Sequence, residues 1–265
     1  MTYQLEQISL VRSRVPIVQD VSLCLRRRRI TGVLGANGAG KSTLLAALSG
    51  ELPPASGKIF IDQKDLQSML PDELARIRAT LTAGVQPVFN LTVRQVLELG
   101  LYSFSDLCAK QKAELTERAI SYTEVQQWMD SPVSVRSLGE QQRIHFARVL
   151  VQAEAGLALN GNGWLLLDEP TANLDPHYQQ QLMSVCQKLA RDQDLGVVVV
   201  MHDLTLALQW CDDVVVLKDG AVLASGLAQD IITPTVIQAM YGSIDAHVIT
   251  HPVKGVVISR KSNDN

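Results

Sequence analysis

Cysteine is sparse in this sequence, and long hydrophobic runs are missing from it. The 265 residues include four cysteines, which are scattered without metal-type spacing: Cys24, Cys108, Cys186 and Cys211. This spacing gives no sign of a cysteine-based metal site and favours reduced thiols in a cytosolic protein. No apolar run approaches the ~20 residues that a membrane helix needs. Any role at a membrane must therefore depend on a partner.

The sequence also has little excess charge of either sign. With 24 basic and 27 acidic side chains, the net charge is −3. This balance gives no general affinity for nucleic acid, and we expect no nucleic-acid partner. The one dense basic run, residues 26–29, stands between two strand-like segments. We predict that it is a solvated hairpin turn, with a polyphosphate or lipid contact as the alternative.

The sequence does have ample apolar residues, in a pattern that changes along the chain. At 46% hydrophobic, it can bury one large core or a core with an attached subdomain. Short apolar segments broken by turn residues predict antiparallel strands between residues 5 and 34. The pattern then predicts a helix over 41–48 and a strand over 58–61, and from 71 to 129 it is helical throughout.

The second half of the chain alternates strands with helices. We predict a helix after Gly139 that runs into a looser Ala/Gly/Asn stretch. We then predict strands over 165–167, 197–201 and 214–217 and a helix over 177–191. A hairpin turn at 218–221 and a helix over 234–241 complete the prediction. Alternation of this kind implies a parallel sheet with helical crossovers. The prediction is one α/β core with an inserted helical subdomain.

A phosphate-binding motif stands between the end of a predicted strand and the helix over 41–48. It fits G-x-x-x-x-G-K-S without deviation, followed by a threonine: Gly35, Ala36, Asn37, Gly38, Ala39, Gly40, Lys41, Ser42 and Thr43. The glycines let the backbone wrap closely around a phosphate, and the helix N-terminus favours the anion. Lys41 would bridge the β- and γ-phosphates of ATP, and Ser42 would bind Mg²⁺.

Polar residues follow two other predicted strands at their carboxyl ends. Asp168 and Glu169 come after the apolar run 165–167, and His202 comes after 197–201. The carboxyl ends of parallel strands are where α/β folds place ligands. We expect Asp168 to hold the Mg²⁺ shell and Glu169 to polarise the attacking water as a general base.

Two further segments carry a family resemblance. The run Ser137-Leu138-Gly139-Glu140-Gln141-Gln142-Arg143 resembles the signature motif of ABC-type ATPases, and Thr171-Ala172-Asn173-Leu174-Asp175 resembles their D-loop. The resemblance implies that two copies close on ATP, with Ser137 and Gly139 of one copy completing the site of the other. It also implies that His202 contacts the γ-phosphate and orients the water.

Within that family, the chain resembles the ATP-binding subunits of hemin importers. This likeness is carried by the segments 35–45, 50–52, 56–57, 74–79, 140–143, 146–150 and 170–175. The segments 224–226 and 239–242 are shared with the wider iron-siderophore and vitamin B12 importer group. The implied fold is a P-loop NTPase ABC ATPase domain over residues 1–265, with a parallel core sheet, an N-terminal antiparallel β-subdomain, a helical subdomain at about 71–155 and a small C-terminal extension at about 233–265.

The resemblance implies partners as well as a fold. A homodimer of this chain would sit beneath two transmembrane permease subunits, peripheral to the cytoplasmic face of the inner membrane. There it would drive import from a periplasmic hemin-binding protein. ATP and Mg²⁺ are the implied cofactors. Ferric siderophores and vitamin B12 are the alternative cargoes.

The sequence departs from the family pattern at three points. Leu138 replaces the first glycine of the usual L-S-G-G-E or L-S-G-G-Q motif, and its bulk should weaken dimer closure. Ala83 occupies the position of the Q-loop glutamine, so Gln86 is a candidate Mg²⁺ and water ligand, with an ordinary loop glutamine as the alternative. No aromatic residue stands where the family often stacks adenine, and Arg12 is the nearest candidate for stacking.

Other functions fit parts of the same pattern. A degenerate subunit that binds ATP but hydrolyses it slowly stays possible because of Leu138 and Ala83. A soluble ABC ATPase of DNA repair or translation would carry two ATPase units in one chain, a long coiled-coil or a zinc insertion, and none is visible in the sequence. A small-molecule P-loop kinase would lack the signature, the D-loop and His202.

Overall fold

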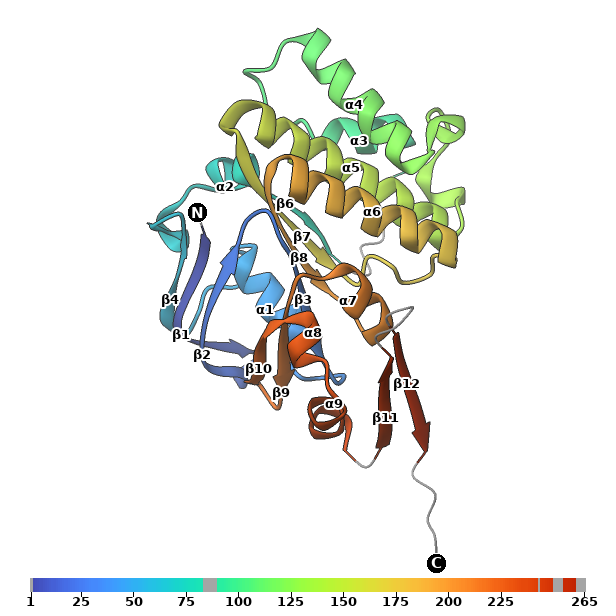
Figure 1. Cartoon of the computed structure of the whole chain (residues 1–265). Helices are drawn as coiled ribbons and strands as arrows, with labels where there is room; N and C mark the ends of the chain where they lie inside the picture. Colours follow the sequence, from blue (N-terminus) through green and yellow to red (C-terminus); the bar gives the residue numbers. More distant parts are fainter. Residues whose placement is uncertain (1, 83–89, 243, 250–254, 261–265) are drawn as a thin grey trace, which may run out of the picture. The chain divides into compact units, whose positions relative to one another are not determined.

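The computed structural model of the chain describes residues 2–82, 90–242, 244–249 and 255–260. Contacts between residues divide the chain into two compact units. Figure 1 shows the helices and strands of both units. Unit 1 comprises Met1–Ser68 and Val198–Asn265, and unit 2 comprises Met69–Val197.

Unit 1 contains an antiparallel sheet built mainly from the N-terminal segment. In hydrogen-bonded order, its strands are β2 (Val15–Arg26), β1 (Thr2–Arg12), β4 (Ser56–Ile61) and β5 (Lys64–Asp65). The turn between β1 and β2 has positive φ at both Ser13 and Arg14. Two such residues are typical of the hairpin turn that matches the twist of its strands. The predicted antiparallel strands are confirmed for β1 and β2.

A second group of strands in unit 1 contains a strand that is buried throughout. β3 (Ile30–Gly35) pairs in parallel with β9 (Asp213–Lys218), which pairs antiparallel with β10 (Ala221–Leu227). On its other side, β3 neighbours β8 (Asp194–Val200), whose last three residues belong to unit 1. All of β3 is buried, as expected for a strand covered on both faces.

The helices of unit 1 are short. They are α1 (Lys41–Leu48), α7 (Leu204–Trp210), α8 (Ala228–Ile231) and α9 (Pro234–Tyr241), with a 3-10 turn at Leu66–Ser68. The predicted helices over 41–48 and 234–241 and the predicted turn at 218–221 are confirmed. After α9, β11 (Ile244–Ile249) and β12 (Gly255–Arg260) pair as an antiparallel hairpin, which the sequence did not predict.

The basic run 26–29 is not the solvated hairpin turn that the sequence predicts. It connects β2 to β3, which belong to different sheets. Arg27 is 6% exposed and forms an ion pair with Asp62 at 3.0 Å, while Arg29 Nη2 donates to Asp213 Oδ1 at 3.0 Å. Alternate arginines therefore point inward to carboxylates. Partners at positions 62 and 213 are too far along the chain for composition to indicate.

Unit 2 is mainly helical. Its helices are α2 (Pro71–Ile77), α3 (Val93–Leu99), α4 (Ala109–Thr123), α5 (Leu138–Asn160) and α6 (Pro176–Asp192), with 3-10 turns at Gln126–Trp128 and Val133–Val135. Its strands are β6 (Arg78–Leu81) and β7 (Asn162–Asp168), which pair in parallel, and the first part of β8, the neighbour of β7. The predicted parallel arrangement is confirmed.

Two predictions for unit 2 are wrong. The interval 71–129 is not helical throughout, because β6 interrupts it and pairs with the buried strand β7. The stretch after Ala153 is not loose, because α5 continues to Asn160. Its buried alanines favour helix, and Gly156 lets the carbonyl oxygen of Arg76 approach to 2.5 Å from where a Cβ would lie.

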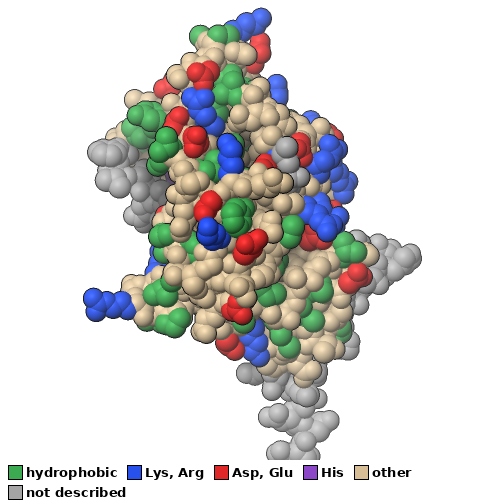
Figure 2. Space-filling model, turned by 90° about the vertical axis from the view of Figure 1, so that its left-hand side faces the viewer, with side chains coloured by type: hydrophobic (Ala, Val, Ile, Leu, Met, Phe, Trp, Pro, Cys, Tyr) green, Lys and Arg blue, Asp and Glu red, His purple; other side chains and the backbone are tan. Residues whose placement is uncertain are grey.

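The described surface carries charges of both signs. On the face drawn in Figure 2, basic and acidic side chains lie intermixed, in keeping with the small net charge. The four cysteines, all within the described residues, are free thiols; Cys186 and Cys211 are buried. No helix in the described ranges combines the length and the apolar character needed to cross a bilayer.

Candidate functional site

The phosphate-binding motif forms a loop in unit 1 between β3 and α1. A Cβ on Gly35, where φ is +152°, would lie 2.4 Å from the carbonyl oxygen of Leu217. At Gly40, where φ is +102°, it would lie 2.9 Å from Val18 Cγ2. Gly38 also has positive φ, but a Cβ there would meet no heavy atom of the described residues within 4 Å. Two glycines are therefore required by close approach, and the third leaves open space on its side of the loop.

Lys41 lies within this loop rather than on the outer surface. Its residue is 6% exposed, and its Nζ donates to the carbonyl oxygens of Gly35 at 2.9 Å and Ala36 at 3.0 Å. Lys41 is also the first residue of α1, and Ser42 and Thr43 follow in its first turn. The loop thus brings a cation, a helix N-terminus and a hydroxyl together, and this set of groups suits a polyphosphate.

His202 follows β8 in unit 1. The amide of Met201 donates to the carbonyl oxygen of Val33 at 3.3 Å, so the carboxyl ends of β8 and β3 are adjacent. His202 is exposed, and Asp203 caps α7 through Thr205 N at 2.8 Å. The structure therefore places His202 next to the end of the strand that leads into the phosphate loop.

Arg12, the candidate for stacking on a base, lies elsewhere in unit 1. It is the last residue of β1, opposite Val15 in the hairpin, and is exposed. A guanidinium at the tip of a hairpin has the freedom to meet a flat ring. Its place on the hairpin does not by itself bring it to the phosphate loop, so its role stays a prediction.

Asp168 is the last residue of β7 in unit 2, and Glu169 follows it directly. Asp168 is 5% exposed, while Glu169 is partly exposed and has φ of 47°. Left-handed backbone in a non-glycine residue is costly and is common at functional sites. The two carboxylates therefore occupy different environments, one buried at the strand end and one turned outward after it.

The predicted signature segment, residues 137–143, starts helix α5. Ser137 caps the helix: its Oγ accepts from Glu140 N at 3.3 Å, and Glu140 Oε2 accepts from Ser137 N at 2.8 Å and from Ser137 Oγ at 3.0 Å. This reciprocal pair is a capping box. The hydrogen bond from the Ser137 amide holds the pKa of the Glu140 carboxyl below its usual value.

Leu138 and Gly139 are held very differently. Leu138 is the first residue of α5, and the residue is 65% exposed. A Cβ on Gly139 would lie 2.7 Å from the carbonyl oxygen of Asn173, in the segment predicted to be a D-loop. The close approach of the backbone therefore depends on Gly139, whereas the side chain at position 138 extends into open surroundings.

Gln142 ties the signature segment to the residues that follow β7. Its Nε2 donates to the carbonyl oxygen of Pro170 at 3.1 Å and approaches that of Glu169 at 3.5 Å. Sequence reasoning did not single out this side chain, because its partners lie in a distant segment. Its place inside the signature segment was the one available signal.

The structure therefore groups the predicted site residues within each unit. Unit 1 holds the phosphate loop, His202 and Arg12, and unit 2 holds Ser137, Gly139, Asp168 and Glu169. Gln86 and Ala83 lie outside the described residues. The groups in unit 1 suit phosphate binding, and the carboxylates in unit 2 suit metal binding and proton transfer.

Comparison with known proteins places these features in context. Residues 18–172 match the ABC transporter family. The chain is 42% identical over 252 residues to the hemin import ATP-binding protein HmuV of Bordetella pertussis, covering 95% of this chain and 96% of that protein.

Solved structures share the fold. An inward-facing metal-chelate type ABC transporter superposes with a TM-score of 0.79 at 22% identity, covering 98% of both chains. A dimeric bacterial ABC transporter cassette superposes with a TM-score of 0.74 at 22% identity, covering 85% of this chain and 98% of that chain.

Proposed function

Since the chain belongs to the ABC transporter family, among the hemin import ATP-binding proteins, we propose that it is the ATP-binding and ATP-hydrolysing subunit of a hemin importer. The observation that carries the nucleotide part is the phosphate loop, in which Gly35 and Gly40 allow close backbone packing and Lys41 lies inside. The observation that favours hemin over ferric siderophores or vitamin B12 is the name of the relatives that match nearly the whole chain.

The residues fit ATP with Mg²⁺. The amides of residues 35–43, Lys41 and the N-terminus of α1 would hold the phosphates, and Arg12 would contact the adenine. Ser42, Asp168 and Gln86 would hold Mg²⁺, since hydroxyl, carboxylate and amide oxygens are the ligands that it prefers. When bound, Mg²⁺ would neutralise charge that develops on the phosphate oxygens.

Hydrolysis would then depend on side chains at two strand ends. Glu169 would accept a proton from the attacking water as general base, and His202 would orient that water and contact the γ-phosphate. In a closed homodimer, Ser137 and Gly139 of one copy would contact the nucleotide held by the other. The dimeric cassette with the same fold supports this arrangement.

We also propose how the chain is used in the cell. Residues 1–265 would act as one ABC ATPase domain, with a helical subdomain at about 71–155 and a C-terminal extension at about 233–265. Two copies would bind two transmembrane permease subunits at the cytoplasmic face of the inner membrane. Closure on ATP would then drive release of hemin from a periplasmic binding protein into the permease.

The proton-transfer role is tested with Glu169→Gln. The amide cannot take the proton, so turnover should fall by about 100-fold or more while ATP binding and the closed dimer persist. ATPase assays, nucleotide titration and size-exclusion chromatography with ATP measure these three properties. Glu114→Gln, at an exposed position of α4, is the matched control. Unchanged turnover in Glu169→Gln would remove Glu169 from the role of base.

The cargo is tested in the whole assembly. The chain is purified with its permease in lipid nanodiscs, and ATPase activity is measured with a binding protein loaded with hemin, a ferric siderophore or vitamin B12. Stimulation by hemin alone supports the proposal. Stimulation only by one of the other two cargoes would overturn it.

A further inference from the structure

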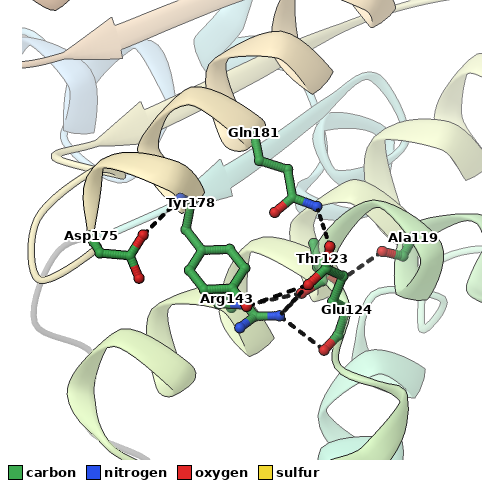
Figure 3. Close-up of polar contacts among 7 residues, drawn as sticks. All are labelled: Ala119, Thr123, Glu124, Arg143, Asp175, Tyr178 and Gln181. Atoms are coloured by element: carbon green, nitrogen blue, oxygen red, sulfur yellow. Dashed lines mark hydrogen bonds and ion pairs between the residues drawn. The ribbon is translucent and has the colours of Figure 1, made fainter.

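Arg143 lies at the centre of a contact network that joins three helices of unit 2 (Figure 3). The residue is 8% exposed. Its Nε and Nη2 donate to the carbonyl oxygen of Thr123 at 3.0 Å and 2.6 Å, and Nη2 also donates to that of Glu124 at 2.9 Å. The second turn of α5 is thereby fixed to the end of α4.

Aromatic rings complete the surroundings of this guanidinium. Its Cζ lies 3.7 Å from the centroid of the Tyr178 ring and 4.9 Å from that of the Trp128 ring. A buried guanidinium this close to aromatic rings gains cation–π attraction, strongest where water is excluded. Tyr178 stands in the first turn of α6, where its amide donates to the capping carboxylate of Asp175 at 3.1 Å.

Glu124 connects all three helices. Its backbone ends α4 in the left-handed conformation, with φ of 53°. Its Oε2 accepts from Tyr178 Oη at 3.3 Å and lies 3.7 Å from Arg143 Nη2, and its Oε1 accepts from Gln181 Nε2 at 3.2 Å. These contacts offset the cost of left-handed backbone in a residue that carries a Cβ. A glycine would avoid that cost but would lose every side-chain contact.

The network continues a line of attachments along α5. Gly139 packs against Asn173, Gln142 donates to Pro170, and Arg143 contacts Tyr178. Each step along the start of α5 thus meets the segment that leads from β7 into α6. The proposed closed dimer requires the signature segment of one copy to reach a nucleotide in the other, while Glu169 serves its own copy. The angle between the signature segment and the segment that follows β7 therefore affects both nucleotide sites of the dimer.

We propose that Arg143, Glu124 and Tyr178 are positioning residues that hold the signature segment and the D-loop in a fixed mutual orientation, so that both move together when two copies close on ATP. This inference rests on the proposed function. In that function, these three side chains contact neither ATP nor Mg²⁺. Their loss should therefore reduce turnover and closure while leaving nucleotide binding by the phosphate loop intact.

The test compares kcat, the affinity for ATP and the protein concentration that gives half-maximal ATPase activity. Arg143→Lys keeps the charge but loses the planar fork, and Tyr178→Leu loses the ring. Each should lower kcat or raise the half-maximal concentration by about three- to thirtyfold, the range typical of coupling residues, with unchanged affinity for a fluorescent ATP analogue. Tyr178→Phe keeps the ring and should recover most of the activity.

Matched variants separate positioning from general damage. Tyr122→Leu removes another aromatic–cation contact of unit 2, in which Lys188 Nζ lies 5.3 Å from the Tyr122 ring, and it should leave turnover unchanged. Because Arg143 and Tyr178 act together, the double variant should lose less than the product of the two single losses. Thermal melting of each variant shows whether it folds, and Tyr178→Phe provides a variant that keeps the packing.

Three outcomes would overturn the inference. They are wild-type turnover and concentration dependence in Arg143→Lys and Tyr178→Leu, an equal loss in Tyr122→Leu, and independent effects in the double variant. Failure of the proposed function would differ from all three, because the wild-type chain would then show no ATPase activity and Glu169→Gln would change nothing.

Discussion

The phosphate loop and the signature segment both depend on glycine, but for different reasons. In the phosphate loop, Gly35 has a backbone conformation that L side chains rarely adopt, and neighbouring atoms already crowd its Cβ position. In the signature segment, Gly139 is helical and is required only because Asn173 approaches it. One site is specified by local backbone shape, and the other by contact with a distant segment. A sequence motif therefore identifies the phosphate loop more completely than it identifies the signature segment.

The largest expected effect is a loss of stability in the phosphate loop, where local backbone shape requires glycine. Gly35→Ala combines an unfavourable φ with a 2.4 Å approach to Leu217 O, so the free energy of unfolding should fall by about 3 kcal/mol or more. Gly38→Ala shares the positive φ but has open space, so it should cost about 1–2 kcal/mol. Urea unfolding measures both. Equal losses would show that crowding is not the distinguishing factor.

The next effect concerns binding rather than folding. Lys41→Ala removes the cation of the phosphate loop and should weaken ATP affinity about 10- to 100-fold, as expected for lost charge-assisted hydrogen bonds. Isothermal titration with ATP measures this change. Lys64→Ala, on exposed β5, is the control. Retained affinity in Lys41→Ala would contradict the assignment of the loop.

The signature segment, where contact with a distant segment requires glycine, is tested at two adjacent positions. Gly139→Ala brings a Cβ to 2.7 Å from Asn173 O and should cost about 1–3 kcal/mol, with reduced ATPase activity. Leu138→Gly should change the free energy of unfolding by about 1 kcal/mol or less, because the residue is 65% exposed. If the leucine side chain obstructs dimer closure, its removal should raise turnover. No rise, or a fall, would show that the segment has adapted to leucine.

The smallest effect lies further along α5. Burial raises the pKa of Glu154 to about 7, despite an ion pair with Arg118 at 3.1 Å. The folded state therefore favours the neutral carboxyl, and stability from this group declines as pH rises from 4.5 to about 7.

Glu154→Gln removes that pH dependence. The variant should match the wild type near pH 5, where the Glu154 carboxyl is neutral. Near pH 8 it should be more stable by at least about 1 kcal/mol, because the wild type then buries a charged carboxylate whereas the amide stays neutral. Thermal melting at both pH values measures the difference, with Glu117→Gln, at an exposed position of α4, as the control. A variant less stable than the wild type at pH 8 would show that the ion pair outweighs burial.

Sequence patterns predicted the elements whose signals are local. The helix over 41–48 follows directly from the phosphate motif, and the strands around 165–167 and 214–217 are apolar runs of the right length. β6 was not predicted because it is only four residues long and directly follows a helix, so its strand character is evident only from its pairing with β7. The end of α5 was missed because alanine and glycine look loose unless their burial is visible.

The candidate site shows the same division. The sequence predicted the phosphate loop, the carboxylates after β7 and the polar loop that opens α5 as local motifs. It could not predict that Gln142 would bind the carbonyl of Pro170, or that Tyr178 would lie over Arg143, because these pairs are 28 and 35 residues apart. Such contacts depend on tertiary packing, for which a single sequence holds no signal.

Glu124 has a consequence for how this part of the chain can change over evolutionary time. Its backbone, its carbonyl and both carboxylate oxygens have different partners, so a change at this position alone would break several contacts at once. Residues in contact tend to co-vary. We therefore expect positions 124, 143 and 178 to be exchanged as a set among relatives, so that a glycine or asparagine at 124 accompanies a different pair at 143 and 178.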